Sequence, residues 1–447
     1  MASSRKSKSD DLLTRAAGAL VPAVPAGSSI LLGLSGGADS VVLLHLLAQL
    51  APRHSWKLSA MHVHHGISRK ADDWAAFCRE LCAHYDILLQ VEEVDISPLR
   101  DMGVEAAARE LRHAALARQP VDFVALAHHR DDQAETMLLQ LLRGAGVRGV
   151  SAMAPVQPRS GKPTLLRPLL DVARTELLEY AGRQGLQWVD DESNADDRYP
   201  RNYLRHRVLP VLENRFPAYR ETLARSARHF AEAGELLDQL ALQDMQGAVL
   251  DGGLEVVRLK ELNTVRAKNL LRFFIARQGA LLPESVKLQE MLRQLCTARS
   301  DAAVHIGFGE WRIGRFRGRV YVFPDLPEAP ADFCVAWRNE SELVLPELGG
   351  TLHFIQAAGQ GASLAKLQDA KVSLRLRRGA ERLRPDAKRP ARTLKNLLQE
   401  HGIPPWRRDT LPLLYCDEIL VAVPGIGVDC AFQATAGEQG VLPEWVC

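Results

Sequence analysis

The sequence has few cysteines, and their positions follow no pattern. Seven cysteines are scattered over 447 residues, an odd number without paired spacing, so we expect no disulfide framework and a reducing compartment, the cytoplasm. Long apolar runs are also missing: none approaches the ~18–20 residues that span a bilayer, so no membrane segment is expected. The N-terminus is basic but lacks the apolar stretch of a secretory signal, and residues 1–28 are expected to form a flexible tail.

An excess of charge of one sign is lacking overall but present locally. The formal net charge is only +2, whereas twelve Lys/Arg stand against three Asp/Glu between Lys371 and Arg408. This bias favours a patch that binds nucleic-acid phosphates, with an ordinary solvated surface as the alternative. In this segment Trp406 is expected to be a core anchor rather than a base-stacking platform. Three leucines are expected to face inward: Leu394, Leu397 and Leu398.

The chain is too long for one hydrophobic core. At 447 residues it exceeds the ~250–300 residues of a single core, so several domains are expected. Residues 29–216 alternate strand and helix patterns, which is typical of a Rossmann-like α/β domain with a parallel sheet. The predicted strands are 29–34, 57–65, 87–96 and 121–129, and the predicted helices are 40–50, 71–85, 103–118 and 132–143. In such sheets ligands bind beyond the carboxyl ends of the strands.

The remaining sequence predicts two further domains. Residues 217–330 form a helical middle domain with helices at 218–245, 259–276 and 284–296, followed by a short β meander at 303–323. Residues 331–370 are expected to be a linker and the start of the C-terminal region. Residues 371–447 predict a small α+β domain with one helix at 392–401, which Gly402 and two prolines end.

A glycine turn lies between the first predicted strand and its helix. The string Ser35-Gly36-Gly37-Ala38-Asp39-Ser40 frees backbone N–H groups at a helix N-terminus, which suits a phosphate or pyrophosphate. It is neither a Walker A loop nor G-x-G-x-x-G. Two adjacent glycines alone could be a purely structural turn. The full string is far more specific, and it predicts an anion site.

A polar cluster follows the fourth predicted strand. His128 and His129 end the strand, and Asp131, Asp132 and Glu135 open a helix. A well-capped helix would account for Asp131 alone. The other acids predict a site for a cation, either Mg²⁺ or an amino group; zinc is the weaker alternative because no cysteine accompanies these residues.

Two further polar segments are expected near this cluster. His65 ends the second predicted strand, where an adenine could stack, and Arg109 and Arg112 share one helix face. The segment 190–212 combines five acids with Arg201 and Arg205 and predicts a functional loop leading into a basic helix.

Taken in order, these strings resemble one family. "SGGADS", "HVHHGIS", "EAAARELR", "AHHRDDQAET", "DESNADDRYPRNYLRHRVLP" and "TLKNLLQEHGIPPWRRDTLPLLY" resemble the tRNA(Ile)-lysidine synthases, N-type ATP pyrophosphatases of the PP-loop superfamily. The resemblance covers 29–216 and 374–428, about half of the chain. Arg130 is a departure, since the family more often has an apolar residue there.

The resemblance implies a specific reaction. Free L-lysine is ligated to C2 of the wobble cytidine (position 34) of the CAU-anticodon tRNA(Ile), through an adenylated cytidine. The products are lysidine, AMP and pyrophosphate, and the tRNA changes its specificity from methionine to isoleucine. The implied cofactors are ATP and Mg²⁺, and the implied partners are tRNA(Ile) and lysine, with no membrane and no obligate protein partner.

The same resemblance, together with residue chemistry, assigns the site residues. Catalysis is expected of Asp39, Asp132 and Glu135, and Asp39 is also the expected Mg²⁺ ligand. Lysine is expected at Asp132, Glu135 and Arg205, because acids can recognise its ammonium and accept its proton. ATP is expected at Ser35, Gly36, Gly37, Ala38, Asp39, Ser40, His65, Arg112 and His128. tRNA is expected at Arg201, Arg389, Arg392, Lys395, Arg407 and Arg408.

Three other functions fit the sequence less well. tRNA thiolation needs reactive cysteines, whereas Cys78 and Cys82 lie four apart on a predicted helix and do not form C-x-x-C. A small-molecule amide ligase or amidotransferase does not explain the basic C-terminal segment. A non-catalytic RNA-binding protein would be expected to have a broken PP-loop, and this one is intact.

Overall fold

The computed structural model describes residues 8–66, 68, 70–97, 103–192, 196–299, 304–325, 330, 332–368 and 370–446. The chain forms two compact units, one up to Leu240 and one from Ala241 onward, and each is described by itself.

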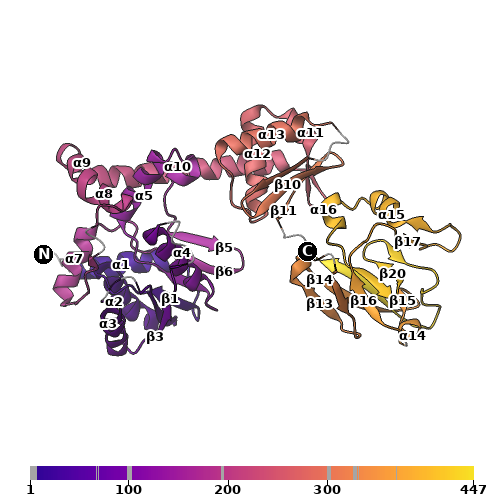
Figure 1. Ribbon diagram of the computed structural model, residues 1–447. Helices are drawn as coiled ribbons and strands as arrows, with labels where there is room; N and C mark the ends of the chain where they lie inside the picture. Colours follow the sequence, from indigo (N-terminus) through magenta and orange to yellow (C-terminus); the bar gives the residue numbers. More distant parts are fainter. Residues whose placement is uncertain are drawn as a thin grey trace. The chain divides into compact units, whose positions relative to one another are not determined.

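The first unit is built on a six-stranded sheet in the order β3-β2-β1-β4-β6-β5. All neighbouring strands are parallel except β5 and β6, which form an antiparallel hairpin at one edge (Figure 1). The predicted parallel sheet is confirmed, but the hairpin was not predicted. The strands are β1 (Ser29–Gly33), β2 (Lys57–His64), β3 (Leu88–Glu93), β4 (Phe123–Ala125), β5 (Val156–Arg159) and β6 (Lys162–Leu166).

Helices connect these strands as the sequence predicts. The helix after β1 is apolar on nearly every face and is buried along most of its length, from Ala38 to Ala51. This burial fixes the start of the helix, and with it the glycine turn, at the carboxyl end of β1. The helices are α2 (Ala38–Arg53), α3 (Ala71–His84), α4 (Val104–Ala117), α5 (Arg130–Leu142), α6 (Val147–Val150) and α7 (Arg174–Gln184).

The N-terminal segment is a helix, so the expectation of a flexible tail was wrong for the described part of residues 1–28. Helix α1 (Lys8–Leu20) buries Leu12, Ala16 and Leu20 in the core of the sheet domain. These residues recur every four positions, so they form one face of a helix. Arg15 adds a 2.7 Å ion pair with Glu176 at the start of α7.

A helical segment completes the first unit. It contains α8 (Pro200–Tyr203), a π-helical turn η3 (Leu204–Val208), α9 (Leu209–Arg215) and the long helix α10 (Tyr219–Met245). The prediction of one continuous helix at 218–245 is confirmed. π-turns occur mostly inside helices at functional sites, and this one carries Arg205.

The second unit begins with an α+β part. Three helices pack on a five-stranded antiparallel sheet in the order β7-β8-β11-β10-β9. The predicted β meander is confirmed as β9, β10 and β11. The strands are β7 (Val249–Leu250), β8 (Gly253–Glu255), β9 (Val304–Phe308), β10 (Trp311–Phe316) and β11 (Arg319–Pro324), and the helices are α11 (Val256–Glu261), α12 (Thr264–Arg277) and α13 (Ser285–Thr297).

The rest of the second unit contains two larger sheets and one two-stranded ribbon. One sheet has the order β12-β16-β19-β20-β21, the other has the order β13-β14-β22-β15, and β17 pairs with β18. The strands are β12 (Cys334–Ala336), β13 (Glu342–Leu345), β14 (Gly350–Ala358), β15 (Ala362–Ser363), β16 (Val372–Arg375), β17 (Arg382–Leu383), β18 (Arg392–Thr393), β19 (Leu413–Cys416), β20 (Ile419–Val423), β21 (Gly427–Val428) and β22 (Gln439–Val446). The short helices are η4 (Pro346–Leu348), α14 (Leu364–Leu367), α15 (Leu394–Glu400) and α16 (Pro405–Arg408).

Residues 331–370, expected to be a linker and the start of the C-terminal region, belong largely to this fold over their described part. Strand β14 pairs along its whole length with the C-terminal strand β22. Leu352 and Phe354 on β14 share a core with Leu374 on β16, which excludes an independent linker over these strands. The leucine stripe of α15 is buried as predicted. Trp406 stacks on Phe323 at a centroid distance of 4.7 Å, which confirms it as a packing anchor.

We expect Leu20→Ala to destabilise the first unit by about 2–5 kcal/mol, since it removes a fully buried side chain and leaves a cavity. Val21→Ala is the matched control, because Val21 is 44% exposed and surface changes of this kind usually stay within about 0.5 kcal/mol. Calorimetry of the full chain measures both. Equal melting of the two variants would contradict the packing of α1 described here.

Candidate active site

The glycine turn has the geometry of an anion cradle. Gly36 has φ +85°, and a Cβ there would meet Val189 at 2.9 Å, so glycine is required by both conformation and space. Gly37 is the N-cap of α2. Ser40 Oγ donates to the Gly37 carbonyl at 2.9 Å and lies 3.1 Å from Ser35 Oγ, which holds the turn in shape. The backbone N–H groups of this turn and the start of α2 therefore suit phosphate oxygens.

Asp39, in the first turn of α2, is the acid nearest the cradle. Its Oδ2 lies 3.5 Å from His129 Nε2. Its Oδ1 is buried and has no hydrogen-bond partner among the described residues. A carboxyl oxygen without a hydrogen-bond partner beside a phosphate cradle is suited to a metal ion or to a proton.

His129 is a buried cation between carboxylates. It is 2% exposed, and its ring nitrogens lie 3.4 Å from Asp132 Oδ2 and 3.6 Å from Asp131 Oδ2. Burial opposes the imidazolium charge, but Asp132, Asp131 and Asp39 outweigh it and raise the pKa of His129 to about 10. A charged His129 therefore holds three acids near one another at neutral pH.

The two predicted catalytic acids of α5 are already paired. Glu135 is 1% exposed, and its oxygens accept from Arg201 Nε and Arg205 Nε, both at 2.7 Å. Asp132 Oδ1 accepts from Arg201 Nη2 at 2.8 Å, and Asp132 Oδ2 accepts from the His129 backbone N–H at 2.9 Å. Asp132, at the third position of the helix, therefore caps the backbone N–H of His129.

The same pairing involves Arg201. Arg201 was predicted to contact tRNA, but its guanidinium lies against Asp132 and Glu135 with its side chain 15% exposed. A buried carboxylate needs a charged partner, and Arg201 supplies one. Arg205, predicted to contact lysine, shares Glu135 with it.

A cavity of about 200 Å³ lies beside these acids. It carries both signs of charge, and Tyr219, whose hydroxyl is buried without a partner among the described residues, also lines it. Asp131 in its wall is held by Arg220 Nε at 2.6 Å and by the backbone N–H of Arg174 at 3.0 Å. The lining residues are His129, Asp131, Glu135, Arg174, Thr175, Leu178, Arg205, Leu209, Pro210, Tyr219 and Arg220.

Two predicted ATP residues carry neutral rings. Both ring nitrogens of His65 and Nδ1 of His128 are buried without a partner among the described residues. Burial, with Arg112 adding repulsion, lowers the pKa of His65 to about 4. Burial also lowers the pKa of His128, to about 3, against the pull of Asp132. Arg112 therefore lies near His65, as an ATP-binding role would require.

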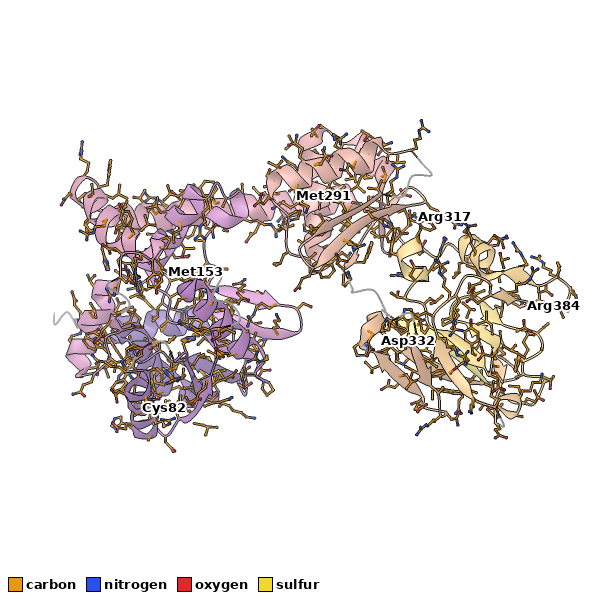
Figure 2. The ribbon with its side chains drawn as sticks, viewed as in Figure 1. Cys82, Met153, Met291, Arg317, Asp332 and Arg384 are labelled. Atoms are coloured by element: carbon orange, nitrogen blue, oxygen red, sulfur yellow. The ribbon has the colours of Figure 1, made fainter. Side chains whose placement is uncertain are left out.

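The predicted tRNA residues of the second unit surround α15 and α16. Arg392 pairs with Glu400 at 2.6 Å, and Arg408 Nε donates to the Ile403 carbonyl at 2.8 Å. Arg389 lies 3.5 Å from Asp386. Lys395 and Arg407 are exposed. Arg384, labelled in Figure 2, lies next to β17 on the same part of this unit.

Several residues of the site were not predicted. Arg174, Tyr219 and Arg220 reach the cavity from α7 and α10, and no local motif marks them. Among the described residues, no group of three or more His, Cys, Asp or Glu has the geometry of a metal site. In the same part of the chain no helix is both long and apolar enough to traverse a bilayer.

The geometry can be compared with known proteins. The PP-loop domain family matches residues 10–212, the TilS substrate binding domain matches 254–321, and the TilS substrate C-terminal domain matches 372–445. A tRNA(Ile)-lysidine synthase of Nitrosomonas europaea is 45% identical over 94% of this chain and 92% of that protein. Proteins of the same name from Azoarcus sp. and Coxiella burnetii are 43% and 38% identical, over 95% and 94% of this chain and 93% and 94% of theirs.

We expect the charge of His129 to stabilise the first unit in a pH-dependent way. Its pKa rises from 6.5 in the unfolded chain to about 10 in the fold, so the stabilisation is complete below pH 6.5 and is lost as the pH rises towards 10. Calorimetry from pH 6 to 10 should show a steeper loss of melting temperature for the wild type than for His129→Gln. His84→Gln, at an exposed position, should keep the wild-type slope; parallel profiles for all three proteins would refute the charged state.

Proposed function

Since the chain belongs to the tRNA(Ile)-lysidine synthase family, we propose that it joins free L-lysine to C2 of the wobble cytidine of a CAU-anticodon tRNA(Ile). The chain is thus an ATP-dependent ligase that modifies tRNA. The observation that carries the site assignment is the open carboxylate oxygen of Asp39 beside the glycine cradle. The free thiols and the membership in this family support action in the cytoplasm.

The first step is adenylation of the base. The 2-oxo oxygen of cytosine attacks the α-phosphate of ATP, and the bond to the β-phosphate oxygen breaks to release pyrophosphate. The backbone N–H groups between Ser35 and Ser40 would hold the departing phosphates. Where Mg²⁺ is bound, it neutralises phosphate charge. Asp39 would hold it, because its open oxygen is the hard ligand that Mg²⁺ prefers.

The second step needs lysine with a neutral ε-amine. At pH 7 deprotonation of an amine with pKa 10.4 costs roughly 5 kcal/mol. A carboxylate of the site must therefore accept the proton. The amine then attacks C2, and AMP leaves with the former 2-oxo oxygen. The adenylate matters because an unmodified carbonyl oxygen is a poor leaving group.

The cavity beside Glu135 supports the lysine site. Its acids, Asp131 and Glu135, suit an ammonium group, and its arginines, Arg174, Arg205 and Arg220, suit a carboxylate. Free lysine carries both groups. Because Glu135 is fully paired with Arg201 and Arg205, an ammonium that reaches it must displace one guanidinium. Lysine binding is therefore expected to move the helical segment, α8 and η3, that carries these arginines.

Recognition of the tRNA body is assigned to the second unit. Lys395 and Arg407 are exposed, and Arg389 and Arg392 are held in place by acidic neighbours around the same short helices. Exposed cations near one another suit the phosphates of an RNA backbone.

Sulfur transfer is disfavoured by the state of the cysteines. Burial raises the pKa of Cys78 to about 12 and that of Cys82 to about 11. Both thiols are therefore protonated at neutral pH, whereas a sulfur carrier needs a thiolate.

The central test is incorporation of labelled lysine into tRNA(Ile) together with pyrophosphate release. Asp39→Asn should lower the rate by about 10²–10⁴-fold, with tRNA affinity changed less than a few fold, because Asp39 acts on ATP and not on the RNA backbone. Asp86→Asn is the control. Asp86 is exposed and precedes β3, so it lies at the amino ends of the strands, whereas Asp39 lies at the carboxyl ends. Near-normal turnover by the Asp39 variant would refute the role of Asp39, and no incorporation by the wild type would refute the function.

A second test separates lysine from ATP. Glu135→Gln should raise the KM for lysine by at least about tenfold, a loss of ~1.4 kcal/mol of binding, while the KM for ATP stays within about twofold. Glu179→Gln, an exposed change on α7, should alter neither. An equal rise in both constants would assign Glu135 to ATP and its metal instead. A melting curve of each variant checks that the buried ion pairs have not collapsed.

A further inference from the structure

Two arginines of the β5–β6 hairpin lie outside the candidate active site, and one of them, Arg159, stands opposite Lys162 at the start of β6. Arg167 directly follows β6, and β6 pairs in parallel with β4, with Leu166 opposite Ala125. His128 follows β4 by three residues. Arg167 therefore emerges at the carboxyl edge, two strands away from the glycine cradle of β1, in the order β1-β4-β6. The hairpin that carries it, β5–β6, lies at the margin of the sheet (Figure 1).

Arg167 is a buried cation to which no carboxylate of the described residues is bonded. It is 6% exposed and donates from Nη1 to the Ala154 carbonyl at 2.8 Å and from Nη2 to Gln157 Oε1 at 3.0 Å. Its Nε is buried and has no partner among the described residues. Neutral acceptors alone do not offset the cost of burying a guanidinium charge.

The charges around Arg167 are also positive. Burial, with repulsion from Arg109 on α4 and Arg159 on β5, lowers the pKa of Arg167 to about 10. Arg159 donates from Nε to the Pro163 carbonyl at 2.9 Å, and its Nη2 is buried without a partner in the described part of the chain. Burial and these same arginines lower the pKa of His113 to about 4, so this ring stays neutral.

The contrast with the neighbouring arginines is informative. Arg201 and Arg205 are half-buried in the same unit, but Asp132 and Glu135 pair with both of them. Arg167 is buried and Arg159 is half-buried, and their acceptors are main-chain and amide oxygens. An anion would neutralise these guanidinium groups and accept their remaining hydrogen bonds. A guanidinium group can donate two parallel hydrogen bonds to two oxygens of a phosphate.

We propose that Arg159 and Arg167, with Arg109 beside them, bind a backbone phosphate of the substrate RNA next to the nucleotide that is modified. This inference rests on the proposed function and extends it. The glycine cradle of β1 already serves the phosphates of ATP. Strands are about 4.8 Å apart, so β6 lies roughly 10 Å from β1, a distance that leaves room for a nucleoside between the two sites. The base then faces ATP over β1 and β4, and the RNA backbone continues towards β6.

The test measures binding of a CAU anticodon stem-loop RNA as a function of salt, without ATP or lysine. Arg159→Ala should weaken binding about 5–20-fold and reduce the logarithmic salt slope by about 0.7, the value for one phosphate contact of a single strand. Arg159→Lys should keep most of the slope, because it keeps the charge. Lys162→Ala is the matched control, since Lys162 is exposed on the same hairpin and faces Arg159 in the β5–β6 register. Arg167→Gln should behave like Arg159→Ala if its melting temperature is preserved.

The outcomes separate this proposal from the function. Wild-type affinity and slope in Arg159→Ala overturn the phosphate site, even when the wild type incorporates lysine. A raised KM for ATP with unchanged RNA binding also overturns it, because the bound phosphate is then that of the nucleotide. The wild type could incorporate no lysine while the arginine variants lose RNA affinity and reduce the logarithmic salt slope. That result would support the RNA phosphate site and refute the lysine reaction.

Discussion

The buried carboxylate of Glu135 is the constraint around which the first unit assembles its site. A charge that is 1% exposed must be paired, and its partners, Arg201 and Arg205, lie 66 and 70 residues further along the chain. Their pairing draws α8 and the π-turn onto α5. The same segment then forms one wall of the cavity, while α7 and α10 form the others. The cavity therefore exists because the acid is buried.

The same ion pairs suggest how the two chemical steps stay in order. In the lysine site that we propose, Glu135 is not available to an ammonium while it holds two guanidinium groups, and the amine of lysine remains protonated and unreactive. When lysine binds, its ammonium has to replace one guanidinium group at Glu135. This exchange leaves the net charge around Glu135 unchanged, but it requires movement of residues 201–205. A π-turn, whose backbone hydrogen bonds are less regular than those of an α-helix, is a suitable place for such movement.

The sequence predicted those parts of the fold that depend on residues close together in the chain. The glycine turn, the parallel strands, the long helix at 218–245 and the inward leucines of α15 each depend on neighbours a few residues apart. The pairing of Arg201 with Asp132 and Glu135 was not predicted, because these partners are distant in sequence and the positive charge of Arg201 suggested RNA. The helix α1 was missed because a basic first segment obscured an apolar face with a four-residue repeat.

The two groups of arginines lead to a division of labour within the first unit. Where carboxylates neutralise the arginines, at Arg201 and Arg205, the site can exchange a guanidinium for an ammonium and so suits lysine. Where the acceptors are neutral, at Arg159 and Arg167, the net positive charge suits a phosphate. In strand order, the acids that pair with Arg201 and Arg205 follow β4 on α5, between the glycine cradle after β1 and Arg167 after β6. A base placed over β4 would have ATP towards β1, its own backbone towards Arg167 and the amine of lysine towards the acids of α5, so the charge pattern orients all three reactants.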